Sequence, residues 1–192
     1  MCLVTGPESV GYEDQLKAKF EPARIRATLS FAGLYQILHE MIKHAVIDEV
    51  RQFYRTGFDE AGWQHDEVAY RTKVTALDPR SKFRASALWL VDSKAITRAQ
   101  ADRLDAIYAH RHELSHELIK YVVDPAFEPD VDLFTDAAEI LKAVARFWTS
   151  VEIDIGTFEH LGDVDIDEIA PLSLIVLQQC VDAYVGGLPS QE

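Results

Sequence analysis

The chain has 192 residues, of which 48% are hydrophobic and 27% charged, so it can form a core, and disorder over most of its length is excluded. Its 32 acidic and 19 basic side chains give a formal charge of −13, a field that opposes broad binding to nucleic acid or anionic membranes. No segment approaches the roughly 18 apolar residues of a membrane span, and the two cysteines form no disulfide framework. We therefore expect a cytoplasmic protein that does not enter a membrane.

Apolar residues at three- and four-residue spacing predict a first long helix over residues 23–58, bent near Gly33. A weaker amphipathic pattern covers residues 66–77. Asp78 followed by Pro79 is typical of a helix start and predicts a second helix up to Val91.

The second half of the chain shows the same helical spacing. Thr97 and Gln100 have the arrangement of a capping box and predict a helix that runs to Val123. A further helix is predicted over residues 131–155, and a last one from Pro171 to about Val185. We predict no strand pair.

These elements predict an all-α fold, a helical bundle of four or five main helices. Residues 1–22 are interpreted as an N-terminal extension and residues 23–155 as the bundle. Residues 156–192 would supply an acidic loop, which begins at Gly162, and a C-terminal helix packed on the bundle within the same domain.

Glycine is absent from residues 63–155. The phosphate-binding loops of dinucleotide-binding and NTPase folds need glycine where the backbone approaches phosphate. These folds are therefore excluded for the middle of the chain, and we predict neither a cofactor nor a bound metal.

Three of the seven histidines lie in one short string, Ala109-His110-Arg111-His112-Glu113-Leu114-Ser115-His116-Glu117. On a helical wheel, Arg111 and Ser115 fall in the middle of the predicted buried stripe, whose members are Leu104, Ile107, Tyr108, Leu118 and Val122. A guanidinium on that face requires a partner, solvent or an anionic ligand. The sequence therefore indicates a functional role for Arg111.

This string resembles the motif of the HEPN superfamily, in which an Arg, usually followed by a polar residue, precedes a His within a long amphipathic helix. Here Arg111 and the polar His112 precede His116, although the family more often has Asn or Asp in the position of His112. The resemblance covers about residues 23–155 and implies a HEPN-like helical bundle.

The resemblance also implies a function, that of a metal-independent endoribonuclease of toxin or anti-phage type. Arg111 and His116 would be the catalytic pair, with His112 in support. The implied partners are a second copy of the chain, a single-stranded RNA substrate and a cognate antitoxin or regulatory protein. Because five residues correspond to about 140° around a helix, one copy aims Arg111 and His116 poorly at one phosphate, and a homodimer would bring two motifs into one cleft.

Two alternatives remain open from the sequence. The first is a non-catalytic helical interaction module, including a degenerate HEPN domain, in which Glu117 pairs with Lys120 on a solvated helix face. The second is a zinc hydrolase, because residues 112–116 also spell H-E-x-x-H, with Glu139 as an assumed third ligand. Four basic residues are candidates for a path along which RNA would approach the motif, namely Lys120, Arg80, Lys82 and Arg84.

Overall fold

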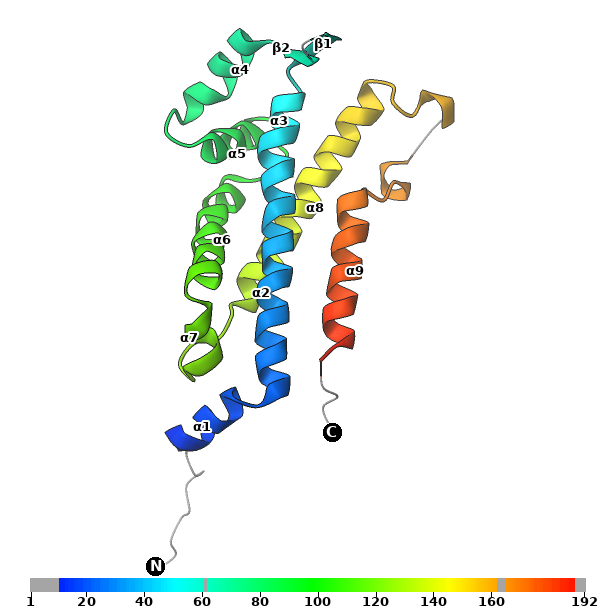
Figure 1. Ribbon diagram of the computed structural model, residues 1–192. Coiled ribbons are helices and arrows are strands. Elements are labelled where there is room, and N and C mark those ends of the chain that lie inside the picture. Colours follow the sequence, from blue (N-terminus) through cyan, green and yellow to red (C-terminus); the bar gives the residue numbers. More distant parts are fainter. Residues whose placement is uncertain (1–10, 61, 162–164, 189–192) are drawn as a thin grey trace, which may run out of the picture.

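The computed structural model describes residues 11–60, 62–161 and 165–188, and within them the chain is mainly helical, as the sequence predicts (Figure 1). Its α-helices are α1 (Tyr12–Lys19), α2 (Pro22–Lys43), α3 (Glu49–Gln52), α4 (Glu67–Lys73), α5 (Lys82–Asp92), α6 (Arg98–His116), α7 (Leu118–Val123), α8 (Val131–Asp154) and α9 (Leu172–Gly186). The shorter elements are a π-helical turn, η1 (His44–Asp48), the 3₁₀ turns η2 (Thr75–Leu77), η3 (Glu159–Leu161) and η4 (Ile166–Glu168), and the strands β1 (Arg55–Asp59) and β2 (Gly62–His65).

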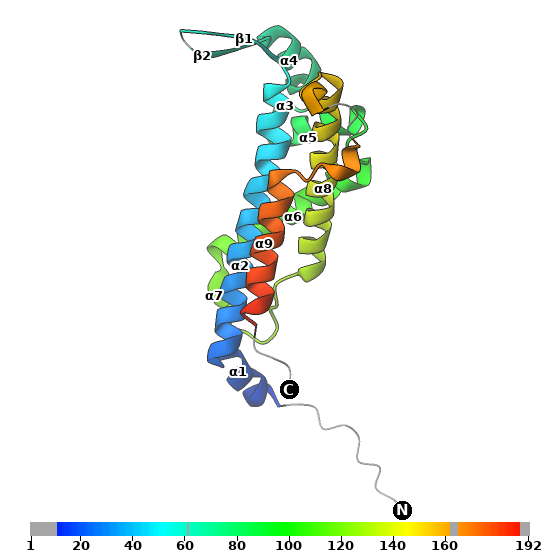
Figure 2. The ribbon, with the colours of Figure 1, turned by 90° about the vertical axis from the view of Figure 1, so that its right-hand side faces the viewer.

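Helix α2 is the centre of the bundle. It contacts α6 and α7 on one side and α8 and α9 on the other, as Figures 1 and 2 show from two directions. Its buried face includes Tyr35, Leu38 and Ile42, which recur at helical spacing and are all but inaccessible to solvent. The bundle is therefore organised around one helix that is covered from several sides.

The buried face of α2 continues through η1 to Val46 and Val50, which are also inaccessible to solvent. In a regular α-helix, residues four apart are offset by about 40° around the helix axis. Apolar residues at repeated four-residue spacing would therefore drift off the buried face. The wider π-turn absorbs this rotation. The Ala45 carbonyl in this turn accepts a hydrogen bond from Nε1 of the Trp148 indole at 3.0 Å.

The prediction of an uninterrupted helix over residues 23–58, and of no strand pair, is wrong. The helix ends at Gln52 and is followed by an antiparallel hairpin in which Phe58 faces Trp63. All residues of β1 are exposed, so the strand lacks the alternation of apolar and polar residues that would reveal it in the sequence. Side-chain contacts between the two strands stabilise the hairpin in place of burial. One of them is the guanidinium of Arg55, which lies 4.3 Å from the centre of the Trp63 ring.

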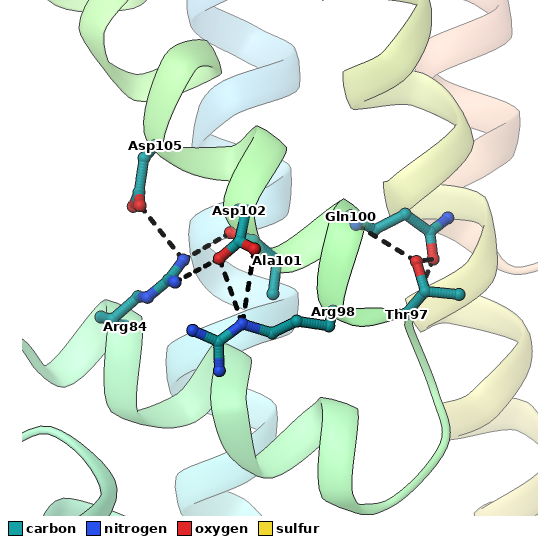
Figure 3. Close-up of polar contacts among 7 residues, drawn as sticks. All are labelled: Arg84, Thr97, Arg98, Gln100, Ala101, Asp102 and Asp105. Carbon is teal, nitrogen blue, oxygen red and sulfur yellow. Dashed lines mark hydrogen bonds and ion pairs between the residues drawn. The ribbon is translucent and has the colours of Figure 1, made fainter.

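The junction between α5 and α6 combines a confirmed and a corrected prediction (Figure 3). Thr97 and Gln100 form the predicted capping box of α6. The preceding helix begins later than predicted, because the side chain of Ser81, and not that of Asp78, caps α5. Arg84 then joins the two helices by donating to the Ala101 carbonyl at 2.7 Å.

The predicted helix from residue 97 to Val123 is in fact two helices. Glu117 leaves the helical conformation with φ −125° and ψ 25°, and α7 starts at the next residue. No proline or glycine marks this break in the sequence. A helical wheel drawn through it therefore misplaces every residue of α7.

The two ends of the described chain pack on the bundle in different ways. Helix α1 is held by Lys19, whose buried ammonium donates to the Tyr121 and Phe127 carbonyls and pairs with Glu128 at 2.9 Å. Helix α9 contacts both α2 and α8. In the predicted acidic loop, residues 162–164 lie outside the described residues.

Helix α8 ends where the sequence predicts. Gly156 adopts φ +82°, a left-handed conformation, and a Cβ at this position would lie 2.7 Å from a Glu159 carboxylate oxygen. Among the described residues, no helix is both long enough and apolar enough to cross a bilayer.

Replacing Trp148 by Phe tests the role of the π-turn. The substitution keeps an aromatic ring but leaves the Ala45 carbonyl without its donor, so we expect the free energy of unfolding to fall by about 1–3 kcal/mol in urea titrations. Trp63→Phe in the exposed hairpin is the matched control and should change it by less than about 0.5 kcal/mol. Equal losses in the two variants would contradict the assignment.

Candidate functional site

The position of His110 decides how α6 presents its motif. The imidazole is buried, lies edge-on to the rings of Tyr35 and Tyr121, and accepts a hydrogen bond at Nε2 from the Asp130 backbone N–H at 3.0 Å. Because Nε2 is an acceptor, the ring proton is on Nδ1. Burial lowers the pKa of His110, so the ring is a neutral core residue.

The predicted buried stripe of α6 is therefore corrected. The helix buries Leu104 and Ile107, as predicted, together with His110 and Leu114, whereas Tyr108 is 52% exposed. Arg111 lies at the edge of the core, and its side chain is 26% exposed. Polar partners on α2 offset the desolvation of the guanidinium at this position.

Arg111 is held by two polar side chains of α2. Its Nε donates to Gln36 Oε1 at 2.7 Å, and its Nη2 lies 3.6 Å from Glu40 Oε1. Gln36 also donates to the hydroxyl of Ser115, which in turn donates to the Arg111 carbonyl at 2.9 Å. Among the described residues no hydrogen bond is made by Nη1 of Arg111, so this edge of the guanidinium keeps unused donors.

The two other predicted site residues, His112 and His116, are exposed and adjacent. Their ring centres are 4.3 Å apart, one helical turn from each other. Within the described part of the chain neither ring makes a hydrogen bond to another protein group. The structure therefore brings two solvent-facing imidazoles together on the helix that carries Arg111.

The H-E-x-x-H alternative receives no support from the geometry. Glu113, which would be the base, accepts a hydrogen bond from the Tyr121 hydroxyl at 2.7 Å and pairs with Lys120 at 3.3 Å. The Tyr121 hydrogen bond is the main cause that lowers the pKa of Glu113. The described residues contain no group of three His, Cys, Asp or Glu that could hold a metal, so Glu139 does not complete a site with the two histidines.

Two of the four basic residues suggested for an RNA path, Lys120 and Arg84, are paired with carboxylates. Lys120 pairs with Glu117 at 2.9 Å as well as with Glu113, and Arg84 pairs with Asp102 and Asp105. The pairing of Glu117 with Lys120 is the contact expected for a solvated helix face.

Sequence reasoning missed His39, a buried neighbour of this site on α2. Its ring is 4% exposed and packs against Tyr108 at 5.6 Å between ring centres, and neither nitrogen has a hydrogen-bond partner. Burial and, second, the positive charge of Arg111 lower the pKa of His39. Polar positions 36, 39 and 40 within an otherwise apolar stretch of α2 were the available signal.

Comparisons of the chain with protein-family models, with curated proteins and with solved structures gave no match. The assignment of function therefore depends on the residues themselves.

The histidines of the core make stability sensitive to acid. Below pH 6.5, the ordinary pKa of histidine, the unfolded chain takes up protons on His39 and His110 that the folded chain does not, because folding lowers both pKa values. The free energy of unfolding should thus fall as the pH drops from 7 to 5.5.

His39→Leu should flatten this dependence and leave stability at pH 7 unchanged or higher, because it removes two buried nitrogens that make no hydrogen bond. The measurement is urea unfolding at a series of pH values. His160→Ala, at an exposed position, is the control and should keep the slope of the original protein. A slope that His39→Leu does not alter would refute the assignment.

Proposed function

We propose that the chain is a HEPN-like, metal-independent endoribonuclease that acts on single-stranded RNA as a homodimer. The observation that carries the proposal is the pair of exposed imidazoles, His112 and His116, beside an arginine with a free edge. Histidine and arginine are the residue types that proton transfer at a ribose and charge compensation at a phosphate require.

Each residue has a role in this reaction. His116 accepts the proton of a ribose 2′-hydroxyl, whose oxygen attacks the adjacent phosphorus while the bond to the leaving 5′-oxygen breaks and that oxygen takes up a proton. Arg111 binds the phosphate oxygens through its free Nη1 edge and offsets the charge that develops there. His112, at 4.3 Å between ring centres, is placed to support His116 or to protonate the leaving oxygen.

The surroundings of the motif favour a second copy of the chain. Tyr108 precedes His112 by one turn and is 52% exposed, and Ile119 follows His116 by three residues and is 68% exposed. Large apolar side chains on both sides of a polar centre are typical of an interface. A two-fold contact through them would bring Arg111 and His116 of two copies into one cleft.

A non-catalytic interaction module is the second candidate. It is favoured by the contacts of Arg111 with Gln36 and Glu40, since these already stabilise the guanidinium without a ligand. In this case the same face would bind a regulatory protein, such as the cognate antitoxin that the resemblance implies, and would cleave nothing.

Cleavage of a mixed single-stranded RNA pool in excess EDTA separates the two candidates. We expect the purified protein to cleave the pool and His116→Ala to reduce the rate by at least about 100-fold, the lower range for loss of a general acid or base. Arg111→Ala should reduce it by a similar factor. His160→Ala is the matched control and should retain full activity, whereas no cleavage by the unaltered protein, or equal cleavage by His116→Ala, would favour the interaction module.

Ile119→Asp tests the dimer. A carboxylate in the apolar flank of the proposed contact should convert a dimer to a monomer, measured by light scattering after gel filtration, and reduce RNA cleavage by at least about tenfold. The control is Ile155→Asp, at a position that is 73% exposed at the end of α8, and it should leave both mass and activity unchanged. A monomeric Ile119→Asp variant with full activity would refute a composite site.

A further inference from the structure

A groove of about 780 Å³ lies along α2, and its lining includes Gln36 and Glu40, which also contact Arg111. It is bounded by α2 and the π-turn, by α8, and by the segment that leads into α9, three elements that Figure 2 shows side by side. Its volume is in the range of small-molecule sites in proteins, roughly 300–1,000 Å³. The apolar lining includes Ile37, Met41, Ala45, Trp148 and Leu172.

The wall of the groove is rigid around Trp148. The indole N–H is fixed by the Ala45 carbonyl, and the ring stacks on Trp89 with an angle of 12° between the planes. Both Trp148 and Ala45 line the groove. The groove is therefore preformed where the π-turn and α8 meet, and a ligand would not have to order this wall.

One part of the groove is acidic and lacks a compensating cation. Glu49 and Glu152 line it together, and burial, followed by the charge of Glu152, raises the pKa of Glu49. The nearest partner of Glu49 is His44, whose Nδ1 is 3.7 Å from a carboxylate oxygen. In the described part of the chain neither carboxylate pairs with a lysine or arginine, and Arg55, which is near enough to act on Glu49, is bound to Gln52 and stacked on Trp63.

The third carboxylate of the groove, that of Glu40, is compensated by positive charges. Glu40 already pairs with Lys43 at 3.3 Å and lies beside Arg111. The uncompensated negative charge is thus concentrated at Glu49 and Glu152, next to an apolar wall. A metal ion does not fit this arrangement, because the described residues offer no group of three ligands.

We propose that this groove binds an organic cation, a protonated amine carried on an apolar body of about the size of a phenylethyl group. The ammonium lies between the carboxylates of Glu49 and Glu152, and the apolar body lies against Met41 and Trp148. Anions are repelled by the same carboxylates, and a neutral ligand leaves them uncompensated. None of the residues proposed for RNA cleavage, Arg111, His112 and His116, lines the groove, although Gln36 and Glu40, which contact Arg111, do.

The test compares three probes of one shape that differ in charge: 2-phenylethylammonium, 2-phenylethanol and phenylacetate. Calorimetric titration of the full chain should show saturable binding of the amine, at least about tenfold tighter than the alcohol, and no binding of phenylacetate. Raising the salt concentration should weaken binding of the amine, because its attraction is electrostatic.

Glu49→Gln and Glu152→Gln should each weaken amine binding by about tenfold and bring it close to that of the alcohol. Glu139→Gln, on an exposed part of α8 outside the groove, is the control with the same change in charge and should bind the amine like the original protein. Circular dichroism verifies that each variant is folded. If a variant does not fold, the salt dependence of amine binding to the original protein still tests whether the attraction is electrostatic.

Absence of saturable binding, equal affinity for the three probes, or an unchanged affinity in Glu49→Gln and Glu152→Gln would each overturn the proposal. His116→Ala should bind the amine normally, so the failure of this site and the failure of the ribonuclease are observed separately.

Discussion

The burial of one histidine determines the surface that this protein presents. His110 is fixed between Tyr35, Tyr121 and the backbone of Asp130, and it sets the rotation of α6 about its own axis. Successive residues of a helix are about 100° apart, so a core-facing His110 turns His112 and His116 to the far side and leaves Arg111 at the boundary. The chemistry of the motif is thus arranged by a residue that takes no part in it.

Helix α2 connects the two candidate sites. Gln36 and Glu40 contact Arg111 and also line the groove. The π-turn then places Ala45 and Glu49 along that groove while Val46 and Val50 stay in the core. A regular helix would rotate these residues away, which gives a structural reason for the π-turn at the end of the central helix.

The sequence correctly predicted those features of the fold that depend on interactions between residues close together in the chain. The capping box of Thr97 and Gln100 fixes the start of α6 by side-chain hydrogen bonds three residues apart. The end of the first long helix was missed because Phe53 and Tyr54 keep the helical spacing but pack against Trp89 from another helix.

The candidate site shows the same difference between local features, which the sequence predicts, and contacts between helices, which it does not. The sequence placed Arg111, His112 and His116 together because one segment carries all three. It could not supply Gln36, His39 and Glu40, which reach that segment only through the packing of α2 on α6. Tyr108 was placed in the core because its ring is apolar, although His110 occupies the position that faces Tyr35.

The distribution of charge explains why a second copy matters to the proposed reaction. The chain carries a formal charge of −13, and Lys120 and Arg84 are already paired with carboxylates, so they add little attraction for a phosphate. Arg111 is itself partly compensated by Glu40 at 3.6 Å. In the proposed dimer, a two-fold contact would double the guanidinium edges at one place and exclude water around them, and both effects would strengthen binding of a phosphate where the mean field opposes it. Catalysis by a single copy would have to overcome that field with one partly compensated arginine.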